Sequence, residues 1–416
     1  MARVDADYLR FLARWDRDAD ALRRALSERA GHEVHFADRP PPSEAGAIFG
    51  LFSRDPLAVV TERPDGSREL PYNPYQAWRA IVEERYLGEP KAPLHARIPL
   101  PYHVVPGALR MALYPLVAGR ASHQPEDSPP DPAWPIESRL DGFRAELYAG
   151  LDSAKAVENG GGWPGGKRFP LLVTHDVDTR EGMAKAGPVL DEMVAMGLKP
   201  CFFLVGRGYK WDKGFIEAVR QAGGEIGLHG DLHDNRIAFT SADKAAERLD
   251  TCKEMMEEYG IRGFRSPSLL VSDALYDAVG PRFAWDSSVP DTDTHTLLGA
   301  RRGCGTVFPF RRRGCLVLPI TMPADDRLLL LGYKGLGLVD VLRRKAKHVR
   351  ELGGLCHFLT HPEPHLFGKR VLRDLFRAVF SEILDSGEAW VATPSMVAEY
   401  WESLTAAGAS NGSAAT

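Results

Sequence analysis

The stretch FPLLVTHDVD at residues 169–178 decides the fold class of this 416-residue chain. Its apolar run is typical of a buried strand, and it ends in a histidine and two aspartates. Further along, short apolar runs alternate with helical patterns, which predicts repeated βα units and a parallel sheet or barrel. The expected strands are 169–175, 199–206, 225–229, 263–266, 283–288, 315–321, 355–361 and 389–394. Because such folds carry their chemistry at the carboxyl ends of the strands, the residues that end these strands are the candidates for a functional site.

The chain before this stretch follows a different pattern. Apolar residues spaced along 6–30 predict one amphipathic helix that stops at Gly31. The turn residues 64–66 divide the alternating segment 57–70, which predicts a hairpin, and Asn73 is expected to cap a helix that runs through residue 87. A further helix is expected over 138–157. The N-terminal region is therefore predicted to be mixed α+β.

These patterns divide the chain into three parts. An N-terminal region, residues 1–165, matches no motif and contains a proline-rich connector at about 121–136. The α/β part follows over residues 166–405. The small polar residues 406–416 are expected to be disordered.

Composition excludes some partners. The 52 basic and 56 acidic residues give a net charge of −4, so no global basic field exists to hold a phosphate backbone, and nucleic acid is not expected as a partner. The five scattered cysteines fit reduced thiols, although spacing alone leaves open whether Cys304 and Cys315 pair. The charged N-terminus also lacks the apolar core of a secretory signal, so a cytoplasmic location is expected.

The most apolar stretch, residues 98–119, is interrupted by prolines and an arginine. A spanning helix needs about 20 mostly apolar residues in one run, so no transmembrane span is predicted. The stretch is expected to be a buried part of the N-terminal region. Association with the inner face of a membrane is the alternative.

Three of the expected strands end in groups that could share one metal ion. The first supplies Asp176 and Asp178, the third is followed by His229 and His233, and the penultimate strand reaches His361. Two imidazoles and one carboxylate leave coordination positions open for water and substrate, as hydrolytic metal sites require. Asp178, His229 and His233 are therefore predicted metal ligands. Asp176 is placed to take a proton from water, and His361 to protonate a leaving group.

Each part of this pattern is weak alone. A DxD pair at a strand end also occurs in haloacid-dehalogenase-type phosphatases and in manganese-dependent glycosyltransferases. The phosphatase pattern has Thr or Val where Arg180 stands, and a glycosyltransferase would have no use for the three histidines. The aspartate pair, the histidine pair and the late histidine in this order are far more specific together.

The order of these motifs resembles the NodB-homology polysaccharide deacetylases, also called carbohydrate esterase family four, over about residues 168–405. The matching segments are THDVD (174–178), HGDLH (229–233), FRSPS (264–268), WDSSVPD (285–291) and FLTHPEPH (358–365). The resemblance implies a distorted (β/α) barrel of the NodB-homology type. It also implies one divalent metal ion, most commonly Zn²⁺, with Co²⁺, Mn²⁺, Fe²⁺ or Ni²⁺ as alternatives.

The resemblance further implies roles for individual residues and an activity. The implied roles are general base for Asp176, metal binding for Asp178, His229 and His233, general acid for His361, orientation of the base for Arg265, and substrate binding for Trp285, Leu359, Pro267 and Asp286. The implied activity is hydrolysis of the N-acetyl group of an acetylated sugar, in a glycan or a glycan precursor. An acetylated carbohydrate is accordingly the implied partner.

Two departures from the family pattern keep alternatives open. The common family form has adjacent aspartates, whereas Asp176 and Asp178 are separated by Val177, a spacing that resembles members acting on peptidoglycan or on small amides. Gly230 stands where a hydroxyl residue is common. The alternatives are a hydrolase of a non-sugar linear or cyclic amide, and a catalytically silent carbohydrate-binding protein.

Overall fold

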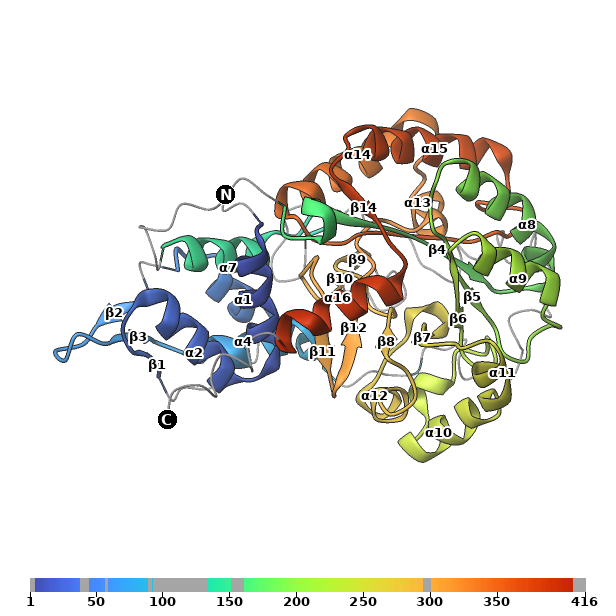
Figure 1. Ribbon diagram of the computed structural model, residues 1–416. Coiled ribbons are helices and arrows are strands. Elements are labelled where there is room, and N and C mark those ends of the chain that lie inside the picture. The colour runs from blue at the N-terminus through green and yellow to red at the C-terminus, as the bar shows by residue number, and fades with distance from the viewer. Residues whose placement is uncertain are drawn as a thin grey trace.

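The computed structural model describes residues 4–37, 45–56, 59–88, 92, 133–150, 161–294 and 301–406. It shows a smaller N-terminal part and a larger part in which helices surround a curved sheet (Figure 1). The apolar stretch 98–119, most of the predicted connector at about 121–136 and the tail after residue 406 lie outside the described residues.

The N-terminal part combines helices with a small sheet, as predicted. Its elements are α1 (Ala6–Arg17), α2 (Ala19–Ala30), β1 (Val34–Phe36), α3 (Ala45–Phe52), β2 (Thr61–Glu62), β3 (Arg68–Leu70), α4 (Pro74–Val82), η1 (Arg85–Leu87) and α7 (Arg139–Gly150). Strand β3 pairs with β1 in parallel and with β2 in the predicted antiparallel hairpin. Asn73 caps α4 as predicted, accepting hydrogen bonds from the N–H groups of Tyr75 and Gln76.

The prediction of one helix over residues 6–30 is wrong, because the chain breaks at Asp18. Its backbone is extended, with φ −166° and ψ 168°, and its side chain accepts a hydrogen bond from the N–H of Ala21 at the start of α2. Asp18 thus caps a second helix instead of continuing the first. The apolar stripe itself was correctly predicted, since Leu12 and Trp15 of α1 and Leu22 and Leu26 of α2 are buried.

The larger part contains every strand that the sequence predicted. Its elements are η3 (Pro164–Gly166), β4 (Phe169–Val177), α8 (Arg180–Ala195), β5 (Cys201–Leu204), α9 (Lys213–Gln221), β6 (Glu225–Leu228), η4 (Ile237–Phe239), α10 (Ala242–Asp250), α11 (Lys253–Glu258), β7 (Gly263–Phe264), η5 (Pro267–Leu269), α12 (Asp273–Val279), β8 (Trp285–Asp286), β9 (Asp293–Thr294), β10 (Arg301–Arg302), β11 (Phe310–Arg312), β12 (Cys315–Val317), α13 (Asp325–Leu330), α14 (Gly335–Leu352), β13 (Cys356–Thr360), α15 (Arg370–Asp385), β14 (Ala389–Val391) and α16 (Pro394–Ala406).

The main sheet has the strand order β11-β12-β8-β7-β6-β5-β4-β13, and β14 also pairs with β4. Every pair in it is parallel except β11–β12. Helices α8, α9, α14 and α15 lie outside the sheet in the manner of βα units (Figure 1). The edge strands β11 and β13 are not paired with each other among the described residues, so the predicted distorted (β/α) barrel is confirmed as an open one.

The strand register brings the predicted functional segments to one edge. Val177, Leu204, Leu228 and Phe264 pair in a row across β4, β5, β6 and β7. The residues that follow this row therefore emerge together at the carboxyl edge of the sheet. They include Asp178, His229 and Arg265, whereas Asp176 lies within β4, one residue before the row.

The N-terminal part packs directly on the barrel. Asp16 of α1 accepts a hydrogen bond from the N–H of Arg311 at 2.7 Å, and Asp141 of α7 accepts one from the N–H of Val307 at 2.8 Å. The rings of Tyr8 and Phe308 meet edge to face, with centroids 6.2 Å apart. One hydrophobic cluster therefore extends through both parts.

Two other sequence questions are also answered. All five cysteines are buried and free, so Cys304 and Cys315 do not pair. Among the helices that the structure describes, none is both long enough and apolar enough to span a bilayer.

Candidate metal and catalytic site

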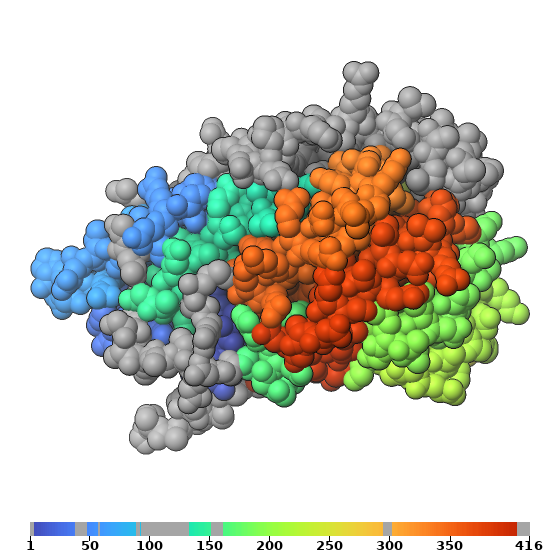
Figure 2. Space-filling model, turned by 90° about the horizontal axis from the view of Figure 1, so that it is seen from above, coloured from blue at the N-terminus to red at the C-terminus, as the bar shows by residue number. Residues whose placement is uncertain are grey.

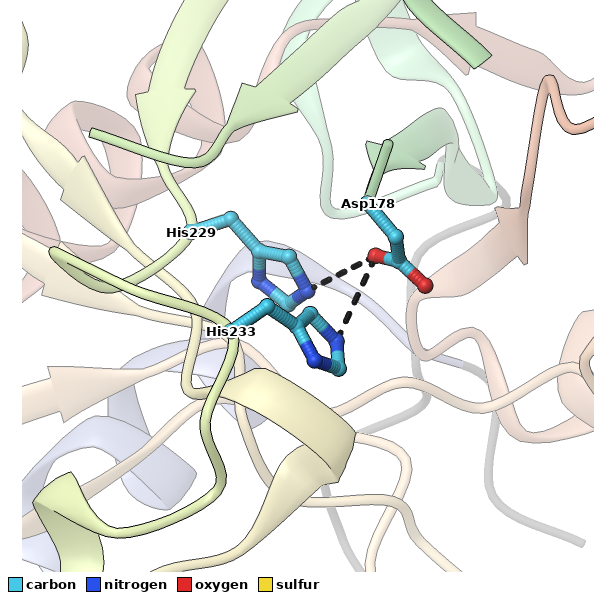
Figure 3. A group of neighbouring side chains, drawn as sticks. All are labelled: Asp178, His229 and His233. Carbon is cyan, nitrogen blue, oxygen red and sulfur yellow. Dashed lines mark ion pairs between the residues drawn. The ribbon is translucent and has the colours of Figure 1, made fainter. Parts of the chain in front are cut away.

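The predicted metal ligands converge at the carboxyl edge of the sheet. Asp178 follows β4, His229 follows β6, and His233 lies four residues further in the same loop. Oδ1 of Asp178 lies 3.2 Å from Nε2 of His229 and 3.5 Å from Nε2 of His233 (Figure 3). All three side chains are buried. They therefore form a compact set of one oxygen and two nitrogen donors.

Electrostatics favour the cation-binding forms of Asp178 and His233. Burial alone would raise the pKa of Asp178, but the His233 and His229 imidazoles outweigh it and hold the pKa below its ordinary value. Burial lowers the pKa of His233 to about 4. Burial alone would lower the pKa of His229, but the Asp176 and Asp178 carboxylates outweigh it and raise this pKa. Nδ1 of His229 lies 3.0 Å from the carbonyl oxygen of Arg265, which orients the ring and leaves Nε2 facing Asp178. A carboxylate and two imidazoles facing one point are ready to share a metal ion.

Gly230 is explained by its backbone and by a close neighbour. Its φ of +68° lies in the left-handed region, and a Cβ there would collide with the ring of Pro267. A hydroxyl residue at this position would therefore strain the loop between His229 and His233. The glycine that departs from the family pattern is the residue this ligand loop requires.

Asp176, the predicted general base, forms an ion pair with Arg265, the residue predicted to orient it. Nη1 of Arg265 donates to Oδ1 of Asp176 at 2.7 Å and to Oγ1 of Thr174 at 3.0 Å. Arg265 is fully buried and also donates to the carbonyl oxygen of Ser287 at 2.7 Å. Oδ2 of Asp176 lies 3.7 Å from Nε2 of His229, beside the ligand set. One carboxylate oxygen is thus fixed by Arg265, and the other faces the predicted metal position.

His361 enters the same site from β13 and has a partner that the sequence analysis missed. Its Nδ1 lies 2.6 Å from Oδ1 of Asp325 on α13. Burial alone would lower the pKa of His361, but the Asp325 carboxylate opposes it and raises this pKa well above the ordinary value. Oδ2 of Asp325 accepts hydrogen bonds from the N–H groups of His361 and Phe367, both at 3.0 Å. Asp325 therefore fixes both the position and the charge of His361.

Glu363 is a second residue that the sequence analysis did not single out. Its Oε1 accepts hydrogen bonds from the N–H groups of Asp178 and Thr179, at 3.0 and 3.2 Å. Burial raises the pKa of Glu363 to about 8. Glu363 thus holds the backbone of the aspartate ligand. It lies in the quoted segment FLTHPEPH, so its motif was a signal for it, whereas Asp325 lies 36 residues before His361 and had none.

One pocket contains the predicted metal ligands, the predicted base and the predicted acid. Asp176, Asp178, His229, His233 and His361 all line it. The predicted residue Leu359 lies there as well. Further lining residues come from the loops after β8 and β12, from α13 and from the N-terminal part, and they include Thr292, Asp293, Met322, Asp326, Arg327 and Trp134.

The other predicted substrate-binding residues lie outside this pocket lining. Trp285 is fully buried, and there its indole N–H donates to Ser395 and its ring packs against Phe203. Asp286 is buried and accepts a hydrogen bond from the hydroxyl of Tyr276 at 2.7 Å. Pro267 packs on Gly230 behind the ligand loop. These three side chains therefore make contacts within the protein and do not line the pocket.

His175, which precedes Asp176, also lies outside the pocket lining. Its ring is buried against Phe202, with centroids 4.6 Å apart, and its Nδ1 lies 2.7 Å from Oγ1 of Thr360. Burial lowers its pKa to about 3. It is therefore a neutral core histidine.

The residues at the ligand set fit a divalent metal ion. Oδ1 of Asp178 is buried and accepts no hydrogen bond, so its lone pairs are available to a cation. A second group, Asp325, Asp326 and His361, also brings donor atoms together. There, the Asp325 oxygens already serve the His361 ring and two backbone N–H groups. The Asp178–His229–His233 group is therefore the better metal site.

Comparison with known proteins finds similarity among solved structures. No protein-family model matches the chain, and no curated protein does. A Mycobacterium smegmatis protein named as a polysaccharide deacetylase is 19% identical, with a TM-score of 0.48, over 60% of this chain and 95% of that one. Puue allantoinase is 16% identical, with a TM-score of 0.47, over 60% and 95% of the two chains.

Another similar structure is described as a CE4 family pseudoenzyme from Bacillus anthracis. It is 16% identical, with a TM-score of 0.38, over 60% of this chain and 71% of that one. The similar structures thus include the family that the motif order resembles. At these identities and scores they assign no activity to this chain.

Proposed function

We propose that this chain is a metal-dependent hydrolase that removes the acetyl group from an N-acetylated sugar, within a glycan or a glycan precursor. One observation carries the proposal. A buried carboxylate–imidazole ligand set lies in one pocket between an arginine-paired aspartate and an aspartate-paired histidine. That arrangement brings metal ligands, a base and an acid into one small volume.

Asp178, His229 and His233 would hold the metal ion. One carboxylate and two imidazoles suit Zn²⁺ best, with Co²⁺, Mn²⁺, Fe²⁺ or Ni²⁺ as alternatives. When bound, such an ion polarises a carbonyl group and lowers the pKa of water from 15.7 to about 7.

The chain's own residues would move the protons. Asp176 accepts a proton from the attacking water, and the permanent charge of Arg265 keeps this carboxylate ionised and oriented. The water oxygen bonds to the acetyl carbon, and the bond from that carbon to nitrogen breaks. His361, charged through its contact with Asp325, donates a proton to the departing amine nitrogen. The products are acetate and the free amino sugar.

Acetate release tests the proposal directly. The purified protein, loaded with zinc or cobalt, is incubated with free, oligomeric, nucleotide-linked and lipid-linked N-acetylhexosamines. Asp176→Asn is the matched control, because it keeps the ligand set and the fold but removes the base. We expect acetate and amine in equal amounts from at least one of these substrates. The control should release both at a rate at least about 100-fold lower.

The alternatives predict different results. Hydrolysis of linear or cyclic amides without acetate release from any sugar would favour the non-sugar amide hydrolase. Sugar binding without hydrolysis of any substrate would favour the silent binding protein. Metal retained at full stoichiometry by His233→Ala would contradict the ligand set and favour a glycosyltransferase.

A further inference from the structure

We propose that Trp134, which precedes the barrel in the chain, is a substrate-positioning residue whose indole forms the wall on which the sugar ring packs. The inference rests on the proposed function and extends it to the N-terminal part, for which the sequence predicted no role. No residue before 169 lies in a motif that resembles the deacetylase family. The pocket wall is therefore a feature of this chain that its motifs did not reveal.

Trp134 faces the same pocket as the catalytic groups. It lines the pocket together with Asp176, Asp178 and His361, and only 7% of its surface is exposed. Its ring packs on Tyr333, from the turn between α13 and α14, with centroids 5.9 Å apart and planes tilted by 39°. The indole is thus fixed by the barrel at the edge of the active pocket.

The backbone beside Trp134 is anchored to the barrel at two points. The hydroxyl of Thr292, itself a pocket residue, donates to the carbonyl oxygen of Ala133 at 2.7 Å. The N–H of Ala133 donates to Glu137 at 2.9 Å, and Nε2 of His348 on α14 lies 3.3 Å from the carbonyl oxygen of Glu137. Residues 133–150, in teal, and the orange residues of the barrel lie beside each other on the face shown in Figure 2. This anchoring makes the segment part of the pocket.

The chemistry of this wall suits a pyranose ring. A hexosamine presents a face of C–H groups and a rim of hydroxyl groups. An indole packs against the C–H face of the ring, while carboxylate and guanidinium groups form hydrogen bonds with its hydroxyl groups. The same pocket contains Asp293 and Arg327, with the Arg327 Nε 3.0 Å from the Asp293 Oδ1. Trp134 and this ion pair therefore offer both kinds of contact to a sugar held by its acetyl group at the ligand set.

Steady-state kinetics with two substrates test the proposal. One substrate is the disaccharide of N-acetylglucosamine, and the other is N-acetylethanolamine, which has the same acetamide but no ring. Trp134→Ala should raise KM for the disaccharide about tenfold with little change in kcat. KM for N-acetylethanolamine should stay unchanged. Trp134→Phe should recover most of the loss, because it restores an aromatic face.

Trp390→Ala is the matched control for loss of an indole. Trp390 lies on β14, packs on Trp163 and is absent from the pocket lining. Its removal should leave both KM values unchanged. An unchanged disaccharide KM in Trp134→Ala, or an equal rise for both substrates, would overturn the proposal.

A binding measurement separates this inference from the proposed function. Calorimetry with the disaccharide compares zinc-loaded Asp176→Asn with the double variant that also carries Trp134→Ala, and affinity should fall about tenfold. If the wild-type protein releases no acetate but this fall is seen, the proposed function fails and the role of Trp134 stands. Equal affinity, or no binding in either variant, overturns the role of Trp134.

Discussion

The charge on His361 is set by Asp325, and this contact determines the expected pH dependence. The pKa of His361 lies well above its ordinary value because the Asp325 carboxylate outweighs burial. The imidazolium is the form that donates a proton, so activity is lost as the pH rises through this pKa. Asp325→Asn removes the carboxylate charge and should lower the pKa. The alkaline limb of the kcat/KM profile should then move to lower pH.

The comparison variant for this prediction is Asp326→Asn. Asp326 also raises the pKa of His361, but less than Asp325 does. Its substitution should move the alkaline limb in the same direction by a smaller amount. Profiles with the same alkaline limb in all three proteins would show that His361 is not the acid.

Arg265 should matter more for turnover than for metal binding. It contacts Asp176 but no residue of the ligand set through its side chain. Arg265→Ala should lower kcat about 100-fold or more while bound metal, measured by elemental analysis, stays near one ion per chain. It also leaves Asp176 buried without its partner, so unfolding free energy should fall by about 3 to 5 kcal/mol. Loss of metal in parallel with kcat, with the fold intact by circular dichroism, would place Arg265 in the metal site instead.

Strand ends and motif order could reveal the side chains that line the candidate site. The two aspartates, Asp176 and Asp178, lie at the carboxyl end of β4, and His229 and His233 lie in the loop after β6. They meet because β4 and β6 flank β5 in one parallel sheet. Asp325 could not be found this way, because a loop and a short helix bring it to His361 from a segment without any motif. Trp285 shows the converse, since its motif position suggested substrate binding but its ring is fully buried against Phe203 and does not line the pocket.

At the level of elements, the close contact between β7 and β8 makes Gly263 a sensitive position. A Cβ at Gly263 would overlap the ring of Trp285, which is fully buried. Gly263→Ala should therefore lower the free energy of unfolding by about 1 to 3 kcal/mol, measured by chemical denaturation. Gly337→Ala is the control, because no atom lies within 4 Å of its Cβ position on α14. It should be neutral, or stabilising by about 0.5 to 1 kcal/mol. Equal effects of the two substitutions would contradict the packing argument.

Helices and strands were easier to predict in the barrel than in the N-terminal part. The apolar runs of the parallel strands are buried on both faces, so composition alone marks them, as in the fully buried β4. In the N-terminal part, the break at Asp18 depends on one local hydrogen bond to the N–H of Ala21. The apolar stripe continues across that break and conceals it, which is why two helices were predicted as one.

At the level of the whole molecule, Asp141 links the N-terminal part to the barrel. It is fully buried on α7, accepts hydrogen bonds from Oγ1 of Thr306 and the N–H of Val307, both at 2.8 Å, and pairs with the buried Arg144. The hydrophobic cluster also runs without interruption through both parts. The two parts should therefore unfold in one cooperative transition, although the sequence predicted separate regions.

Asp141→Ala tests this coupling. It removes the acceptor for two barrel groups and leaves Arg144 buried without its partner, so the free energy of unfolding should fall by about 3 to 5 kcal/mol. Native-state hydrogen exchange should show the same loss of protection in peptides from α1 and from β4, because the amides of both exchange through the same global unfolding. Asp7→Ala removes an exposed pair with Arg10 and should change stability by less than about 0.5 kcal/mol. If β4 kept its wild-type protection in Asp141→Ala while α1 lost its own, the N-terminal part would be an independent domain and the shared core would not couple it to the active site.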